Sequence, residues 1–419
     1  LDRPVAAMLD TKGPEVRLRD FKDGKVRLTA GQEFTLTTAN ILGDETRCAI
    51  SYSELPEAVK PGDTILLDDG LVRLQVLETT DMDIRCRVEN DGDMKNHKGV
   101  NVPSVRLNMP YMSQQDREDI LFGAEQGFDF VAASFVRSAA DIRELRALLD
   151  SVGSSIRIIA KIENQEGVSN LAEILDAADG IMVARGDMGV EIPAEKVPHI
   201  QKMIIRKCNL ACKVVITATQ MLDSMIRNPR PTRAEVSDVA NAVYEGTDAV
   251  MLSGETAMGS YPIEAVRMMS QIAEESEKYL DYMFYQRRKV SAENLRNISN
   301  TVCYSSVATA SDLEATVIVA PSVSGFTTRM LSKWRPKALI AGLSPSMTAV
   351  RQMQLYWGVK PFHAKRAEST DALLFASVEL LKEKGIVKEG EIVVATAGVV
   401  TRANRHEPVA DTNIMRVSV

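Results

Sequence analysis

Charged side chains stand at the ends of two apolar runs in the middle of the chain. Lys161 and Glu163 close the run at residues 156–163, and Asp187 follows the run at residues 180–185. Residues two apart in a strand point to the same side, so Lys161 and Glu163 should face one site. If both runs are parallel strands, their carboxyl ends meet at one edge and Asp187 joins the pair. The pattern predicts a functional site at this edge.

Glu163 and Asp187 are candidates to share one hard divalent cation. Mg²⁺ favours one or two carboxylates, with water and substrate oxygens filling its remaining octahedral positions. The alternative is a structural salt bridge among Lys161, Glu163 and Arg185, because charged residues often end the strands of a barrel. These residues by themselves leave both interpretations open.

The site must be held by a parallel sheet. Apolar runs, each followed by a helical pattern, occur at residues 4–10, 129–134, 156–163, 180–185, 213–219 and 248–253. This alternation indicates a (β/α)8 TIM barrel, of which about six units are present and the first two are absent from this chain. Because the chain starts with Leu1 inside a strand-like run, we expect it to begin inside the fold. Thr232 and Glu235 predict a capping box for a helix that Gly246 ends.

Residues 14–106 have a different pattern. Short alternating stretches at residues 26–29, 33–37, 63–67 and 71–78 are separated by Gly and Asp turns, which predicts a small β-barrel domain. The segment leaves a barrel strand at Asp10 and returns near Leu107, so it should lie over the carboxyl face of the barrel. We expect a mobile lid, and a decorative insert is the alternative.

A second alternation of strands and helices follows a charged helical stretch near residues 274–288. Apolar runs at residues 316–320, 338–343, 358–362 and 392–396 predict a separate α/β domain. We therefore expect a barrel of residues 1–13 and 107–285, a lid of residues 14–106 and a C-terminal α/β domain of residues 286–419.

Composition limits the possible partners. A chain of 419 residues with 45% hydrophobic and 26% charged residues should form several folded domains. The net charge of −7 provides no basic field for nucleic acid or an anionic membrane. No apolar run reaches the roughly 18 residues of a membrane span. The five cysteines include no CxxC pair, which fits a cytoplasmic location.

Six motifs in order resemble those of the pyruvate kinase family, in its bacterial type. They are residues 9–15 (LDTKGPE), 98–101 (KGVN), 182–187 (MVARGD), 218–222 (ATQML), 229–235 (PRPTRAE) and 252–256 (LSGET). The resemblance is close up to about residue 285 and weaker beyond it. It implies an enzyme of glycolysis that transfers phosphoryl from phosphoenolpyruvate to ADP, giving pyruvate and ATP.

The resemblance implies a role for each residue at the strand ends. Glu163 and Asp187 would bind Mg²⁺ or Mn²⁺, and Lys161 would face the transferring phosphoryl group. The N–H groups of Gly186 and Asp187 would bind the substrate carboxylate. Thr219 would stand on the route of the proton to enolpyruvate, with water as the relay. Ser253 and Glu255 would line the water behind Thr219.

Further positions match the cation and nucleotide sites of the family. Asp10 and Thr11 match ligands of K⁺, and Glu15 matches the acidic position that accompanies K⁺ dependence. Arg17 and Lys98, from the roots of the lid, match contacts to the nucleotide phosphates. The family's Arg-x-Asn-x-Ser-His motif would precede residue 1, so we expect these sites to be incomplete in the chain as written.

The C-terminal domain is expected to be regulatory. The loop at residues 322–328 (SVSGFTT) resembles the family's phosphate loop, with Ser322, Ser324, Gly325 and Thr327 as ligands of a phosphorylated allosteric effector. A later stretch with Arg402, Arg405 and His406 would hold a second phosphate or a sugar. On the local pattern alone, an ordinary Ser/Thr-capped helix is the alternative. The resemblance also implies a homotetramer.

Two other functions remain open for this sequence. A class I aldolase also presents a lysine at the carboxyl end of a barrel strand, although carboxylates of the metal-binding kind around Lys161 argue against it. An effector-binding or scaffold protein that keeps the barrel without its first units is the non-enzymatic alternative.

Overall fold

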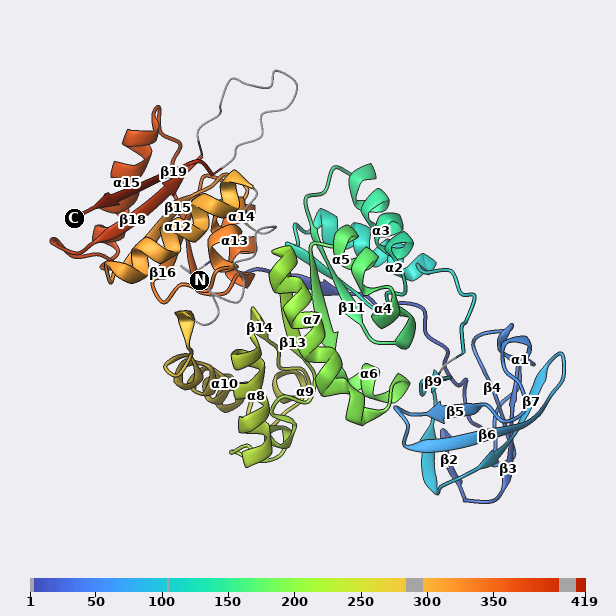
Figure 1. Ribbon diagram of the computed structural model, residues 1–419. Helices are drawn as coiled ribbons and strands as arrows, with labels where there is room; N and C mark the ends of the chain where they lie inside the picture. Colours follow the sequence, from blue (N-terminus) through green and yellow to red (C-terminus); the bar gives the residue numbers. More distant parts are fainter. Residues whose placement is uncertain (1–3, 104, 284–296, 399–411) are drawn as a thin grey trace.

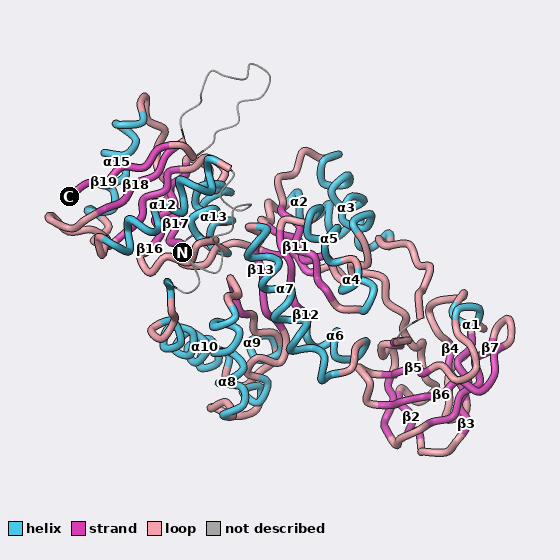
Figure 2. The backbone as a smooth tube through the Cα atoms, in the orientation of Figure 1, coloured by secondary structure: helices cyan, strands magenta, loops and turns pink. Residues whose placement is uncertain are grey.

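The computed structural model of the 419-residue chain describes residues 4–103, 105–283, 297–398 and 412–419. Three parts are visible in Figure 1: a β-rich part in blue, a central α/β part in teal to olive, and a C-terminal α/β part in orange and red. The tube in Figure 2 shows strands in each part, with the central part between the other two. No helix of the described residues is long and apolar enough to cross a membrane.

The central part is built on a parallel sheet. Its six strands are, in spatial order, β1 (Met8–Asp10), β10 (Phe130–Ala133), β11 (Arg157–Ile162), β12 (Gly180–Ala184), β13 (Val214–Ala218) and β14 (Ala249–Val250). Chain order and spatial order agree, as in a curled barrel sheet. All six predicted strands are present, which confirms the α/β barrel class. The first and last are shorter than predicted.

Helices connect these strands. They are α2 (Gln114–Glu125), α3 (Ala139–Ser151), α4 (Gln165–Ser169), α5 (Leu171–Ala177), α6 (Arg185–Glu191), η1 (Ala194–Lys196), α7 (Val197–Ala211), η2 (Asp223–Ile226), α8 (Arg233–Glu245), α9 (Gly254–Ala257) and α10 (Pro262–Glu277). At α8 the capping box is confirmed: the Thr232 hydroxyl accepts from the N–H of Glu235, and the Glu235 carboxylate accepts from the N–H of Thr232. Gly246, at φ 96°, ends the helix in the left-handed conformation.

Side chains alternate across the barrel strands. On β11, Ile158, Ala160 and Ile162 pack in the core under the helices. The opposite face holds Ile159, which lies in an inner cluster with Phe130 and Met182. Lys161 and Glu163 follow Ile159 at intervals of two, so the same alternation that fills the interior directs them to one face at the carboxyl end.

The lid part has its own apolar core. A six-stranded sheet has the order β4 (Arg47–Ala49), β3 (Glu33–Thr37), β7 (Asp83–Val88), β6 (Val72–Thr79), β5 (Thr64–Leu67) and β9 (Val100–Asn101), and β2 (Lys25–Leu28) pairs with β8 (Gly92–Lys95). A short helix, α1 (Leu55–Ala58), joins them. The four predicted strands correspond to β2, β3, β5 and β6. The other four were missed, three of them because they span only two to four residues.

The C-terminal part is a second, mainly parallel sheet. Its order is β17 (Val359–His363), β16 (Leu339–Ser344), β15 (Val317–Pro321), β18 (Val393–Ala397) and β19 (Ile414–Ser418), flanked by α12 (Ile298–Asp312), α13 (Phe326–Ser332), α14 (Met347–Gln352), η3 (Met353–Leu355) and α15 (Thr370–Glu383). The four predicted strands are confirmed. The antiparallel edge strand β19 was not predicted.

Buried charge pairs attach the C-terminal part to the barrel. The guanidinium of Arg335 donates to Asp248 at 2.7 Å, with side-chain exposures of 4% and 8%. Arg351 pairs with Asp129 at 2.9 Å. Met353 and Tyr356 pack into the inner cluster of the barrel. The exact domain boundaries stay predictions, and the one at residues 285 and 286 lies outside the described residues.

Candidate active site

The predicted catalytic residues gather at the carboxyl ends of adjacent strands. Lys161 lies in β11 and Glu163 directly follows this strand, while Gly186 and Asp187 lie in the first turn of α6 after β12. Thr219 follows the last residue of β13. Strands β11, β12 and β13 are neighbours in the sheet, so these three strand ends form one surface.

Lys161 lies at the centre of a polar cluster. Its ammonium contacts Glu163 Oε1 at 3.1 Å and Asp10 Oδ1 at 3.2 Å, and it donates to Ser134 Oγ at 2.8 Å. Ala133 pairs with Ala160 in the register of β10 and β11, which places Ser134 level with Lys161. Burial acts to lower the pKa of Lys161, but the charges of Glu163 and Asp10 outweigh it and raise that pKa. Lys161 is therefore a fixed positive charge.

Glu163 is a deeply buried carboxylate, with 1% of its side chain exposed. Its Oε2 accepts from the N–H of Phe135 at 2.5 Å, and Phe135 has a left-handed φ of 53°. Burial raises the pKa of Glu163 to about 7 against the attraction of Lys161, and the negative charge of Asp187 adds to the rise. Because Glu163 and Asp187 repel each other, the two carboxylates are suited to binding one shared cation.

Thr219 connects the end of β13 to the start of α6. Its hydroxyl accepts from the N–H of Gly186 at 2.7 Å and donates to the carbonyl of Ala218 at 2.6 Å. Its φ is 69° and that of Gln220 is 54°. A β-branched residue in the left-handed region is strained, and such residues concentrate at functional sites.

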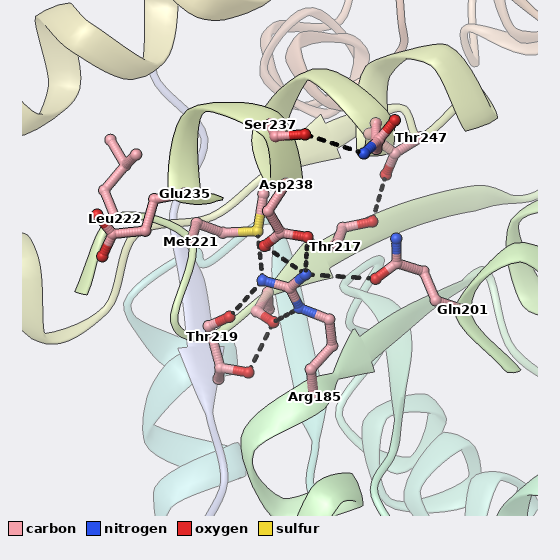
Figure 3. A network of polar contacts seen from close by, with 12 residues as sticks. Arg185, Gln201, Thr217, Thr219, Met221, Leu222, Glu235, Ser237, Asp238 and Thr247 are labelled. Carbon is pink, nitrogen blue, oxygen red and sulfur yellow. Dashed lines mark hydrogen bonds and ion pairs between the residues drawn. The ribbon is translucent and has the colours of Figure 1, made fainter. Parts of the chain in front are cut away.

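Arg185 lies in a polar network with Thr219 and Asp238 (Figure 3). It pairs with Asp238 at 2.7 Å and donates to the carbonyls of Thr219 at 2.7 Å and Ala218 at 3.2 Å. The alternative salt bridge is therefore correct for Lys161 with Glu163 and wrong for Arg185. Arg185 instead fixes the backbone turn that holds the Thr219 hydroxyl near α6.

Glu255 also fixes the backbone near Thr219. Its carboxylate accepts from the N–H of Leu222 at 3.0 Å and from the N–H of Ser253 at 2.8 Å. The buried carboxylate therefore connects the loop after β13 to the loop after β14. A role of Ser253 and Glu255 in lining water behind Thr219 stays a prediction.

The residues predicted for K⁺ lie beside Lys161. Asp10 is exposed and pairs with Lys161, as described above. The buried Thr11 hydroxyl contacts the carbonyl of Ala132 at 3.3 Å and accepts from the N–H of Ser134 at 3.1 Å, while its carbonyl accepts from Ser134 Oγ at 2.7 Å. The Asp10 carboxylate fits a cation, and the Thr11 carbonyl, which accepts one hydrogen bond, keeps a second lone pair.

Two further cationic side chains, Arg17 and Lys98, lie near the two ends of the lid segment. Arg17 Nε contacts Glu15 Oε2 at 2.5 Å, and its NH1 donates to the carbonyl of His97 at 2.8 Å. Lys98 pairs with Asp68 at 2.8 Å. A cleft of about 630 Å³ between the lid and the barrel is lined by Glu15, Arg17, Asp68, Asp69, Lys98, Asp187 and other residues.

Several residues of the site were not predicted. Ser134 contacts Lys161, and Asp68 holds Lys98. Asn101 of the lid donates to Glu191 of α6. Ser134 ends an apolar run and was detectable by the rule that found Lys161. Asn101 and Glu191 were not detectable, because only the folded lid brings them together.

Two carboxylates of the site are the candidate ligands for a metal ion. Within the parts of the chain that the structure describes, no group of three or more His, Cys, Asp or Glu side chains is arranged to hold an ion. Glu163 and Asp187 form a pair with mutual repulsion. A pair of carboxylates fits Mg²⁺, which keeps several positions for water and substrate.

The predicted effector loop has a defined conformation. Gly325, at φ 78°, precedes α13, and Ser322 and Ser324 lie in the loop before it. The hydroxyl of Thr327 is 2.8 Å from that of Thr412, and both residues are buried. The carbonyl of Ser324 accepts from Arg157 at 2.9 Å. Arg402, Arg405 and His406 lie outside the described residues.

Comparisons with known proteins give one answer. The family model for the pyruvate kinase barrel domain matches residues 1–266, and that for the pyruvate kinase alpha/beta domain matches residues 300–418. The pyruvate kinase of Clostridium acetobutylicum is 49% identical over 100% of this chain and 88% of its own length. The pyruvate kinase of Geobacillus stearothermophilus is 49% identical over 100% of this chain and 70% of its own length.

A solved structure agrees with these sequence matches. The crystal structure of a pyruvate kinase from Cryptosporidium parvum has a TM-score of 0.91 and 38% identity, covering 99% of this chain and 84% of that chain. The two relatives and the solved structure each span both the barrel and the C-terminal α/β part. The chain therefore belongs to the pyruvate kinase family of phosphoryl-transferring enzymes.

Proposed function

We propose that this chain transfers the phosphoryl group of phosphoenolpyruvate to ADP, giving pyruvate and ATP in cytoplasmic glycolysis, at the site of Lys161, Glu163, Asp187 and Thr219. One observation carries the assignment of the site: a buried lysine ammonium contacts a buried carboxylate that also experiences the charge of Asp187. This arrangement provides a cation for the phosphoryl group beside two ligands for a divalent ion.

Glu163 and Asp187 are the proposed ligands of Mg²⁺ or Mn²⁺. When bound, the ion would neutralise charge on the substrate oxygens and align them for transfer. Glu163 is held for this role by the N–H of Phe135 and by Lys161. The left-handed Phe135 is strained, and that strain is consistent with a precisely oriented ligand.

Lys161 is proposed to stabilise the phosphoryl group during transfer. Its ammonium is 13% exposed and is held from three sides by Asp10, Ser134 and Glu163. A charge that is already oriented needs no reorganisation when negative charge develops on the transferring oxygens. The raised pKa keeps it protonated at neutral pH.

Gly186, Asp187 and Thr219 are proposed to bind the substrate carboxylate and to pass on the proton. The N–H of Gly186 donates to the Thr219 hydroxyl at 2.7 Å. A substrate carboxylate that took over this N–H would release the Thr219 hydroxyl to contact water or the enol carbon. A threonine is too weak an acid to act alone, so relay through water is the proposed route.

K⁺ and the nucleotide are proposed to bind between Lys161 and the lid. Asp10 provides a carboxylate for K⁺, with Thr11 beside it, and the family's further ligands do not occur in residues 1–419. Arg17 and Lys98 line the cleft and are proposed to hold the phosphates of ADP. Glu15 fixes the guanidinium of Arg17 at 2.5 Å.

A phosphorylated effector is proposed to bind at Ser322, Ser324, Gly325 and Thr327, with Arg402 and Arg405 nearby in sequence to Thr412. The contact between Thr327 and Thr412 supports this, because it places Thr412 beside the loop. A homotetramer is proposed as well. Exposed apolar residues are candidates for a subunit contact, namely Met258 directly after α9 and Ile263 and Val266 on α10.

The metal site is tested by Glu163→Gln and Asp187→Asn. Each change removes one anionic ligand while preserving side-chain size, so the Mg²⁺ concentration for half-maximal activity should rise at least tenfold. Activity is followed as pyruvate production from phosphoenolpyruvate and ADP. Glu195→Gln, at an exposed carboxylate just beyond α6, is the matched control. Wild-type Mg²⁺ dependence in both site variants would reject the assignment.

A further inference from the structure

The lid contacts the helix that carries Asp187. Asn101, at the end of β9, donates from Nδ2 to Oε1 of Glu191 at 2.8 Å. Glu191 is the last residue of α6, and Gly186 and Asp187 lie in the first turn of the same helix. Both partners are half-buried, so the hydrogen bond is partly protected from water.

Asn101 is tied to the phosphate-binding edge of the lid. In the lid sheet, Asn101 pairs with Leu66 on β5, and the turn after β5 contains Asp68 and Asp69. Lys98, three residues before Asn101, pairs with Asp68 at 2.8 Å. Because this edge is joined by backbone and ionic contacts, Asn101, Lys98 and the turn should move as one unit.

The same edge of the lid lies close to Asp187, the proposed metal ligand of the barrel. Partial burial raises the pKa of Asp69, and the charge of Asp187 adds to the rise, so the two carboxylates are close enough to interact. Lys98, Asn101, Asp187 and Glu191 all line the cleft of about 630 Å³. The hydrogen bond therefore spans the cleft in which the nucleotide is proposed to bind.

We propose that Asn101 and Glu191 are positioning residues, whose hydrogen bond fixes the distance between Lys98 on the lid and Asp187 on α6. This inference rests on the proposed function, because it assigns the pair a role in holding the ADP phosphates over the metal site. Displacement of a bound group by about 1 Å can cost about a hundredfold in rate, so such a contact has a measurable effect on turnover.

A second contact between the lid and the barrel provides a control. Arg106 pairs with Glu166 at 3.2 Å, but 84% of the Arg106 side chain is exposed. An exposed ion pair of this kind contributes little. Arg106→Ala breaks a contact between the lid and the barrel and removes a charge from the edge of the cleft. It therefore tests whether the loss of any such contact lowers kcat/KM for ADP.

The decisive experiment exchanges the two partners. Asn101→Asp places two carboxylates against each other and should lower kcat/KM for ADP about tenfold to a hundredfold, the effect of losing a hydrogen bond to a charged group. Glu191→Gln in the same chain restores a donor, because the Gln amide can donate to the new Asp. The double variant Asn101→Asp/Glu191→Gln should recover to within about threefold of wild type.

A second readout separates positioning from general structural support. Asn101→Ala should lower kcat/KM for ADP while Mn²⁺ binding to the free protein, measured by electron paramagnetic resonance, changes less than twofold. Hydrogen exchange of the turn after β5 should be faster in Asn101→Asp and return to the wild-type rate in the double variant. This readout is independent of activity.

Three results would overturn the inference: a double variant as impaired as Asn101→Asp, an unchanged kcat/KM for ADP in Asn101→Ala, or a loss of Mn²⁺ affinity in Asn101→Ala as large as the loss for ADP. Failure of the proposed function looks different. In that case Glu163→Gln and Asp187→Asn would retain full Mn²⁺ affinity. Hydrogen exchange in Asn101→Asp/Glu191→Gln would still decide whether Asn101 and Glu191 hold the lid edge in place.

Discussion

At the scale of single residues, the site depends on a carboxylate that the fold keeps from water. Glu163 is 1% exposed, yet it faces both Lys161 and the charge of Asp187. Burial favours its neutral form, and a cation shared with Asp187 would favour its charged form. Proton and metal should therefore compete for this one side chain.

This competition predicts a pH dependence of metal binding. Burial raises the pKa of Glu163 from 4.5 to about 7, so the folded protein without metal keeps this proton up to about pH 7. Below that pH a divalent ion must displace the proton, and affinity should fall by up to about tenfold per pH unit. Above about pH 7 the affinity should level off. Mn²⁺ titrations at pH 6, 7 and 8 measure the effect.

The control for this titration is Glu163→Gln, which cannot ionise. Its weaker Mn²⁺ binding should show no step near pH 7. Equal affinities at pH 6 and pH 8 in the wild-type protein would show that Glu163 is already ionised at pH 6 or is not a ligand.

The residues of the site were predictable only in part. Lys161 and Glu163 could be predicted because they end an apolar strand with the right spacing, and Asp187 because it follows the next strand. Ser134 ends an apolar run and was detectable by the same rule, but its contact with Lys161 depends on the register of β10 and β11. The interaction between Asn101 and Glu191 depends on how the lid lies against α6, and no local pattern indicates it.

At the scale of elements, ion pairs within the lid orient Arg17 and Lys98, the two cationic side chains that line the cleft. Glu15 and Arg17 lie two residues apart and form a 2.5 Å contact, so Glu15 fixes a side chain that is proposed to bind ADP. Glu15 is also proposed to support K⁺ dependence. The two roles of Glu15 can be separated by substitution.

We predict that Glu15→Lys relaxes the need for K⁺, because the ammonium would supply the missing positive charge. The same change also releases Arg17, so KM for ADP should rise. Glu15→Gln is the matched control: it should raise KM for ADP and still require K⁺. Activity is compared in buffers with K⁺ and in buffers free of both K⁺ and NH₄⁺. Full wild-type activity in the latter would contradict the K⁺ assignment.

Prediction of elements succeeded where the apolar pattern was long. The central strands β10 to β13 are almost wholly buried and stand out as apolar runs. Strand β8 (Gly92–Lys95) is polar and short, and β19 (Ile414–Ser418) lies at the sheet edge with mostly exposed or half-buried residues. Such strands are stabilised by their neighbours, so their own residues carry little signal.

At the scale of the whole molecule, a buried ion pair joins two domains. Arg335 contacts Asp248 at 2.7 Å, and it also donates to the Asn209 side chain and to the carbonyl of Gly246. Removal of one partner leaves the other charge buried. We predict that Arg335→Ala destabilises the protein by about 3–5 kcal/mol, measured by denaturant unfolding.

The double variant Arg335→Met/Asp248→Asn is the control for this effect. It removes both charges and should recover most of the stability, because no buried charge is left without a partner. If Arg335→Ala alone costs less than about 1 kcal/mol, the pair does not hold the domains together.

The proposed regulation would also involve the whole molecule. Thr327 is buried against Thr412, so Thr327→Glu would disturb packing as well as charge. Ser324 is exposed in the same loop, and Ser324→Glu should repel a phosphate without that disturbance. We predict that a sugar bisphosphate, a sugar monophosphate or AMP shifts the phosphoenolpyruvate saturation curve of the wild type and that Ser324→Glu abolishes the shift. A shift that Ser324→Glu leaves unchanged would place the effector elsewhere.

Lys161 is proposed to stabilise the phosphoryl group during its transfer. The most direct measurement follows the ³¹P signal of phosphoenolpyruvate and the β and γ phosphates of ATP during single turnovers of the wild type and of Lys161→Met. Each tenfold loss in rate corresponds to about 1.4 kcal/mol of transition-state stabilisation. We predict that Lys161→Met lowers the rate of ATP formation by several powers of ten and reduces the affinity for phosphoenolpyruvate much less. Equal losses in rate and affinity would contradict it.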